Sequence, residues 1–177
     1  MTQRHEVLDP PLVVLRPMSE ASSKAVLAGE SLPDVRTVDD YPTEFSTGMA
    51  PMVGTESPLG PWLIHRGSDG VVVGDIGGGF TGPGQVEIGY AITDSAQGQG
   101  HASAAVAALV AYARADPRIE VLVGHTPLDR PASARVLQKA GFVRVGEVDD
   151  EHEGQPLRVT EWRLVLHRPP HGEDVSS

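Results

Sequence analysis

The sequence of 177 residues contains no cysteine. Disulfides, thiolate metal sites and a cysteine nucleophile are therefore excluded, and we expect a protein of the reducing cytoplasm. Long hydrophobic runs are missing as well. The apolar run nearest the start, Leu12 to Leu15, is far too short for the hydrophobic region of a signal peptide or for a membrane span. We therefore expect no membrane partner.

Positive charge is scarce, because 14 Lys and Arg residues stand against 24 Asp and Glu residues, which gives a formal net charge of −10. Proteins bind nucleic acids mainly through cationic contacts with phosphate, so this composition argues against a nucleic-acid partner. An acidic surface can attract cationic amines through its field, although it more often only keeps a protein in solution. The length fits one domain with a substantial core.

Two nucleotide-binding motifs are also absent. A dinucleotide-binding turn would carry three glycines after the first strand, with an acidic residue about 20 residues later, and the Walker spacing G-x-x-x-x-G-K-S/T does not occur. The chain does have a glycine-containing turn, Gln97 to Ala102, between a strand-like run and an alanine-rich helix. Glycine lets the backbone approach a ligand closely, and the unpaired N–H groups at a helix start favour a phosphate. The turn therefore predicts a pyrophosphate site.

Hydrophobic periodicity predicts a single α/β domain without internal repeats. The helix expected over residues 101–114 has an alanine-rich apolar stripe, which permits close packing on a sheet. The strands on either side of this helix imply a right-handed parallel crossover. Residues 30–60 show little period and are expected to form a long irregular segment. The expected strands are residues 12–16, 61–65, 71–76, 86–92, 119–125, 142–148 and 158–166, the other expected helices are residues 19–28 and 132–140, and the expected turns and loops are residues 67–70, 77–84 and 149–154.

The turn resembles the Q/R-x-x-G-x-G/A signature of the GNAT superfamily of acyl-CoA-dependent N-acyltransferases, with Gln97, Gly100 and Ala102 at its defined positions. Its flanks are similar to the branch of ribosomal-protein alanine N-acetyltransferases, and the similarity follows the family's order over roughly residues 12 to 166. The similar segments are the opening strand Leu12 to Met18, the second strand Pro61 to Ile64, the E-I-G-Y strand Glu87 to Tyr90 and the helix Ser133 to Phe142.

This resemblance implies a fold and a set of boundaries. The GNAT domain is expected over residues 12–168, after an N-terminal extension of residues 1–11 and before a flexible tail of residues 169–177. The implied fold is α/β, with a mixed, mostly antiparallel sheet of six to seven strands flanked by helices. The strand before the turn and the parallel strand after it splay apart, and residues 30–60 supply a variable helix and loop over the acceptor side. A monomer or a homodimer is expected.

The resemblance also implies acetyl-CoA as co-substrate, no metal, and a primary amine as acceptor, either a small molecule or a protein N-terminus. Another acyl-CoA, or a CoA-binding or regulatory module without turnover, stays open as an alternative. His101 is expected either to contact phosphate or to be a solvated residue at the helix start. The implied cofactor-binding residues are Ile88, Tyr90, Ile92, Gln97, Gly98, Gln99, Gly100, His101, Ala102, Ser103, Arg130 and Ser133.

The chemistry requires a base, because amines are mostly protonated at neutral pH and only the free amine attacks a thioester. Glu87, on the strand beside the wedge, matches a glutamate that serves this role in several relatives, and Asp75 and His125 are weaker candidates. No G-x-S-x-G elbow occurs, so direct transfer is favoured over an acyl-enzyme. Two positions depart from the family: Arg130 replaces an Asn that binds the pantetheine arm, and Leu137 replaces the Tyr that protonates the thiolate. The proton donor is unassigned.

Overall fold

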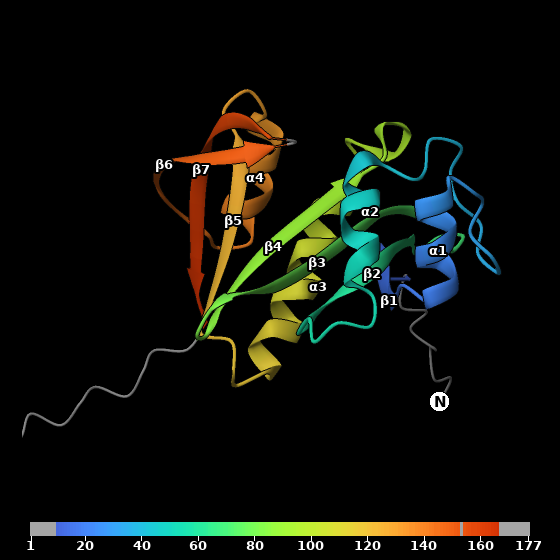
Figure 1. Cartoon of the computed structure of the whole chain (residues 1–177), viewed down its shortest axis with the longest axis horizontal. Helices are drawn as coiled ribbons and strands as arrows, with labels where there is room; N and C mark the ends of the chain where they lie inside the picture. Colours follow the sequence, from blue (N-terminus) through green and yellow to red (C-terminus); the bar gives the residue numbers. More distant parts are fainter. Residues whose placement is uncertain (1–9, 153, 167–177) are drawn as a thin grey trace, which may run out of the picture.

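The computed structural model describes residues 10–152 and 154–166 (Figure 1). Most of the predicted N-terminal extension and the whole predicted C-terminal tail lie outside the described residues, so those domain boundaries stay predictions. The strands are β1 (Val13–Pro17), β2 (Leu59–Arg66), β3 (Val72–Gly82), β4 (Gln85–Ile92), β5 (Val121–Pro127), β6 (Val143–His152) and β7 (Gln155–Val165). The helices are α1 (Glu20–Ala28), α2 (Glu44–Met49), α3 (His101–Ala115) and α4 (Pro131–Lys139), with short 3-10 turns η1 (Ala50–Met52) and η2 (Asp94–Ala96).

The seven strands form one mixed sheet in the order β1-β2-β3-β4-β5-β7-β6, which confirms the predicted fold class. The pair β4 and β5 is parallel, and every other neighbouring pair is antiparallel. The parallel ladder runs only from Gln85 opposite Val121 to Ile88 opposite Gly124. Beyond it the two strands diverge, as Figure 1 shows, and β4 has no strand beside it on that edge.

Helices cover both faces of the sheet. α1 and α2 lie on one face, and α3 and α4 lie on the other (Figure 1). The predicted alanine-rich stripe of α3 is buried from Ala105 to Ala113, where it packs into the main core together with Ile76, Leu122 and Trp162. Alanine keeps this helix close to the strands, so the core positions α3 firmly behind β4. Among the described residues, no helix is both long and apolar enough to cross a membrane.

Capping residues stand at the ends of two helices. Ser19 caps α1 by accepting a hydrogen bond from the amide of Ser22, and Gly29 ends the helix in a left-handed conformation, with φ at 69°. Pro131 occupies the first turn of α4, and Gly141 follows the helix with φ at 94°. These local signals explain why the predicted limits of α1 and α4 are nearly correct.

Two expectations about irregular segments were wrong. The glycine-rich stretch predicted as a turn over residues 77–84 is mostly strand, because β3 continues to Gly82. A β-carbon on Gly78 would lie 2.7 Å from the carbonyl oxygen of Glu87, and one on Gly77 would collide with the side chain of Met49. Glycine is therefore required by close packing and not by a turn. The acidic loop predicted at residues 149–154 is largely the end of β6. Residues 30–60 include the helix α2 between irregular segments, as the resemblance implied.

Candidate active site

A cavity of about 640 Å³ opens where β4 and β5 diverge. Its walls come from the end of β4, from the turn that leads into α3, and from the start of α4. Of the twelve residues predicted to bind a cofactor, the structure brings ten together around this cavity. They are Tyr90, Ile92, Gln97, Gly98, Gly100, His101, Ala102, Ser103, Arg130 and Ser133.

The turn before α3 presents backbone to the cavity. Gly98 and Gly100 have φ angles of 73° and 82°, a left-handed conformation that favours glycine. Gly100 is the N-cap residue of α3 and supplies no side chain to cap the helix. The first N–H groups of this fifteen-residue helix are therefore free to bind an anion, and the helix dipole adds to the attraction.

The side chain of Gln97 stabilises this turn through two hydrogen bonds. Its side-chain nitrogen donates to the carbonyl oxygen of Ile92 at 3.1 Å and to a carboxylate oxygen of Asp94 at 3.0 Å. The amide side chain therefore joins the end of β4 to the turn that follows it. The glutamine of the sequence signature holds the shape of the turn, and its neighbour Gln99 lies outside the cavity lining.

His101 is not the solvated residue that one of the two interpretations expected. Its side chain is 3% exposed, and Nδ1 lies 3.1 Å from the carbonyl oxygen of Ala96. Because a carbonyl can only accept, Nδ1 carries the hydrogen, and Nε2 of the neutral ring is then not a donor. His101 therefore supports η2, and a phosphate contact through Nε2 would require the charged ring.

The edge of β4 that a ligand could use begins after Ile88. Ile88 still pairs with Gly124 in the parallel ladder and does not line the cavity. The strand therefore has no free edge at Ile88 for the predicted contact with the cofactor. Tyr90 does line it, and its hydroxyl donates to the carbonyl oxygen of Ser133 at 3.2 Å. Burial raises the pKa of Tyr90 to about 12, so the hydroxyl keeps its proton and links β4 to α4.

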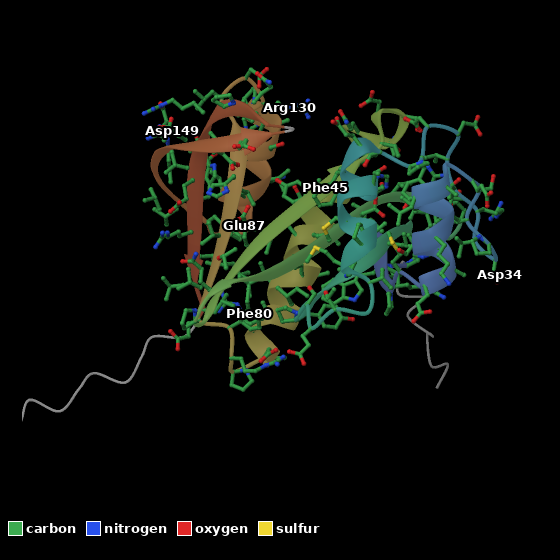
Figure 2. All side chains as sticks on the ribbon, viewed as in Figure 1. Asp34, Phe45, Phe80, Glu87, Arg130 and Asp149 are labelled. Atoms are coloured by element: carbon green, nitrogen blue, oxygen red, sulfur yellow. The ribbon has the colours of Figure 1, made fainter. Side chains whose placement is uncertain are left out.

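Glu87 projects from the other face of the sheet. A β-carbon on Gly89 would meet the ring of Phe45, and one on Gly124 would meet Leu137 of α4, so residues in register with Gly89 face α2. Figure 2 shows Glu87 near the point where β4 and β5 diverge, with Phe45 on α2 and Arg130 near the start of α4. The Glu87 side chain is 45% exposed, as a group that meets an incoming acceptor must be.

The structure brings two of the candidate bases together. Oε1 of Glu87 lies 3.2 Å from Nδ1 of His125, a hydrogen-bonding distance. Nε2 of the same ring lies 3.5 Å from Oε2 of Glu161, whose other oxygen accepts from Arg163 at 2.7 Å. Sequence reasoning missed Glu161. The register that sets it opposite His125 could have identified it, because residues paired across antiparallel strands share a face.

Asp75, the third candidate, is fully buried beneath α2. Its two carboxylate oxygens accept hydrogen bonds from the hydroxyl of Tyr41, at 2.8 Å, and from the hydroxyl of Ser46. Burial raises the pKa of Asp75 to about 6, although both hydrogen bonds oppose the shift. With both oxygens occupied and no exposure, this carboxylate cannot receive a proton from an acceptor amine. It ties α2 and the segment before it to β3.

Comparison with known proteins decides the family. Residues 13–143 match the family model described as an acetyltransferase (GNAT) domain, which is well over half of the chain. The chain belongs to the GNAT family. No protein in a set of curated sequences matches it.

Solved structures with a GNAT fold resemble this one at low identity. RimL, a ribosomal L7/L12 α-N-protein acetyltransferase solved with coenzyme A, is 22% identical, with a TM-score of 0.64 over 88% of this chain and 94% of its own. YncA, a putative acetyltransferase from Salmonella typhimurium solved with acetyl-CoA, is 18% identical, with a TM-score of 0.62 over 90% and 96%. A chimera of spermidine N-acetyltransferase SpeG from Vibrio cholerae and hSSAT is 12% identical, with a TM-score of 0.64 over 88% and 96%.

Both departures of this GNAT protein from its family pattern lie on α4. Arg130 is the exposed N-cap residue of the helix and lies on the cavity lining, where its cationic side chain can reach an anion. Leu137 is buried against Gly124, so no proton donor stands at its position. In the described part of the chain, no group of three or more His, Cys, Asp or Glu side chains is arranged to hold a metal ion.

Proposed function

We propose that this GNAT protein transfers an acetyl group from acetyl-CoA to a primary amine, on a small molecule or a protein N-terminus. One observation carries the proposal. A single cavity joins the uncapped N-terminus of α3 to the unpaired edge of β4, so one extended ligand with a diphosphate can use both. The two solved relatives that contain coenzyme A or acetyl-CoA support the choice of donor. A cytoplasmic location and a monomeric or homodimeric state stay predictions.

In this proposal the diphosphate binds the backbone N–H groups of residues 98–103. The pantetheine arm lies along residues 89–92 of β4 and pairs with their free backbone groups, as an added strand would. Arg130, on the cavity lining near the start of α4, contacts a phosphate oxygen. The thioester then reaches the region where β4 and β5 part, close to the side of the sheet that carries Glu87.

Glu87 is the proposed general base. It removes one proton from the ammonium form of the acceptor, and the amine nitrogen attacks the thioester carbon. As the carbon–sulfur bond breaks to release the CoA thiolate, the nitrogen loses its second proton to water and becomes the amide nitrogen. Leu137 cannot protonate that thiolate. Tyr90, with its pKa raised to about 12, gives up its proton less readily than an ordinary phenol. Water is therefore the proposed proton source for the leaving thiolate.

The buried side chain of Leu137 also favours a second candidate function. A GNAT-fold module that binds CoA without turnover would need the cavity and would not need a thiolate acid. An enzyme that uses a different acyl-CoA would share both the cavity and the base. These alternatives differ from the proposal only in what happens after the cofactor binds.

The experiment measures thiol release from acetyl-CoA with a mixed panel of primary amines, together with the melting temperature with and without acetyl-CoA. We expect turnover and a higher melting temperature, since a ligand that binds the native state stabilises it. Ala102→Glu places a carboxylate at the anion site and should weaken binding roughly 10-fold or more. Ala107→Glu, on an exposed position of the same helix, is the matched control and should bind normally.

Each outcome separates the candidates. A melting shift without thiol release for any amine would favour the binding module over the enzyme. Turnover with a longer acyl-CoA but not with acetyl-CoA would show that the acyl donor is not acetyl-CoA. If acetyl-CoA produced no shift in the wild type, or the same shift in Ala102→Glu as in Ala107→Glu, the proposed anion site would be wrong.

A further inference from the structure

Glu87, His125 and Glu161 lie on the neighbouring strands β4, β5 and β7, and we call them the carboxylate–imidazole cluster. The imidazole stands between the two carboxylates, with Nδ1 3.2 Å from Glu87 and Nε2 3.5 Å from Glu161. Exposure falls along the cluster, from 45% at Glu87 to 20% at His125 and 14% at Glu161. The cluster therefore has one end that an acceptor can touch and one end that it cannot.

The two carboxylates are held differently. Burial raises the pKa of Glu161, but the hydrogen bond and charge of Arg163, together with the nearby imidazole, leave it below its ordinary value. Glu161 is therefore ionised at neutral pH and fixed in place by the guanidinium. Among residues 10–152 and 154–166, only the ring of His125 lies within hydrogen-bonding distance of the Glu87 carboxylate. It keeps free oxygen lone pairs for an acceptor.

Counting donors leaves two neutral tautomers for the ring. A neutral imidazole has one N–H, so either tautomer leaves one carboxylate facing a ring nitrogen without hydrogen. Nε2 is buried and makes no hydrogen bond of ordinary geometry within the described residues. A hydrogen on Nε2, directed at the fixed carboxylate of Glu161, satisfies that atom with a small movement. In this tautomer the lone pair of Nδ1 faces Glu87, and the 3.2 Å contact becomes a hydrogen bond when Glu87 has taken a proton.

We propose that His125 is a positioning residue that accepts the catalytic proton from Glu87, with Glu161 stabilising the ring that results. The inference rests on the proposed acetyl transfer. Glu87 takes a proton from the acceptor ammonium, which frees the amine lone pair for attack. The proton then moves from Oε1 of Glu87 to Nδ1 of His125, which restores the carboxylate and leaves an imidazolium with an N–H toward each glutamate. Water later removes this proton, and no covalent bond to His125 forms.

The first test needs no turnover. Long-range proton–nitrogen NMR of the full chain, at about pH 9 where an ordinary imidazole is neutral, reports which ring nitrogen carries hydrogen. The signal of His125 is assigned by its loss in His125→Asn. We expect the hydrogen on Nε2, and we expect Glu161→Ala to move the population toward Nδ1. A hydrogen resting on Nδ1 in the wild type would overturn the proposal, because no lone pair would face Glu87.

The second test is kinetic. Asn has no proton affinity, so His125→Asn should lower kcat roughly 10- to 100-fold and change the KM for acetyl-CoA less than about twofold. Glu161→Gln keeps the shape without the charge and should lower kcat roughly 3- to 10-fold. His65→Asn is the matched control, since His65 is a buried strand histidine whose Nδ1 meets the carbonyl of Gly70 at 2.9 Å. It should keep its kcat.

A double variant distinguishes a proton relay through His125 from a role of His125 in packing alone. If His125 acts through Glu87, adding His125→Asn to Glu87→Gln should cost less than about a further twofold in kcat. Fully additive losses, or a single His125→Asn variant with wild-type kcat, would overturn the relay and leave the proposed acetyl transfer standing. Wild-type protein that releases no thiol with any amine would overturn the acetyl transfer, and the catalytic role of His125 with it.

Discussion

The two sides of the sheet where β4 and β5 diverge are built from different parts of the chain. On the side of α3 and α4, the cavity wall includes a contiguous turn that contains several small residues, and the proposed recognition groups of this turn are backbone amides. On the side of α2, the chemistry belongs to side chains from β4, β5 and β7, with Phe45 of α2 packed against Gly89. In the proposed function the first side holds the cofactor, and the second acts on the acceptor.

This difference predicts that the two functions can be separated by substitution. Backbone amides at a helix start bind any suitable phosphate and tolerate changes elsewhere. Proton transfer between side chains is sensitive to changes of a few tenths of an ångström in the donor–acceptor distance and to the charge of each partner. Variants on the α2 side should therefore change turnover or stability, while variants of the turn should change the affinity for acetyl-CoA.

The largest effect is expected for Glu87→Gln, which keeps the shape of the base and removes its charge. We expect kcat to fall roughly 10²- to 10⁴-fold, the usual contribution of general base catalysis, with the affinity for acetyl-CoA nearly unchanged. Steady-state kinetics and calorimetry measure the two quantities. Glu120→Gln is the control, because Glu120 is an exposed glutamate just before the first residue of β5. A Glu87→Gln variant with most of its activity at pH 7 would remove Glu87 from the mechanism.

A smaller effect on stability is expected from Asp75, on the same side. Its pKa of about 6 in the folded chain lies above the ordinary value of 3.8. The folded state therefore binds more protons between these values, so the free energy of unfolding should fall as pH rises from about 4 to about 6 and stay low above that. This difference between the two pKa values corresponds to a fall of about 2–3 kcal/mol in the free energy of unfolding.

Asp75→Asn should remove this fall in the free energy of unfolding with rising pH. Its carbonyl can accept from Tyr41, and its amide can donate to the hydroxyl of Ser46, so both hydrogen bonds have a replacement. We expect the variant to be more stable than the wild type at pH 7 by about 1–3 kcal/mol and nearly independent of pH over this range. Urea unfolding at several pH values measures it, with the exposed Asp39→Asn as control. A less stable Asp75→Asn at pH 7 would mean that the charged form is the favoured one.

The same contrast explains what the sequence could predict. The turn, the alanine-rich stripe and the limits of the short helices depend on local sequence, so spacing and residue type were enough to place them, and the resemblance extended them to a fold. The strand glycines Gly77 and Gly78 were misjudged because what crowds them is distant in sequence. The burial of His101, which contradicts one of its two interpretations, was hidden for a related reason, since burial of a helix-start residue depends on how the preceding turn folds back.

The α2 side was less predictable. Glu87 and His125 were both selected as candidates, but their contact requires the parallel register of β4 and β5. Glu161 carries no local signal at all. Its role follows only from its position opposite His125 in the ladder of β5 and β7. Asp75 illustrates the reverse error, because a carboxylate on a central strand gives no hint in the sequence that Tyr41 and Ser46 occupy both of its oxygens.

The smallest effect is expected within the turn itself. Gln97→Ala removes two hydrogen bonds that join the turn to the end of β4, while Gln99→Ala changes an exposed neighbour outside the cavity lining. These bonds are solvent-exposed, so their loss should loosen the turn and weaken acetyl-CoA binding only about 2- to 5-fold, or about 0.4–1 kcal/mol. Gln99→Ala should bind within error of the wild type, and both variants should keep the wild-type kcat at saturating acetyl-CoA. Calorimetry on the pair measures the difference. Equal affinities in the two variants would show that backbone conformation alone, set by Gly98 and Gly100, shapes the anion site.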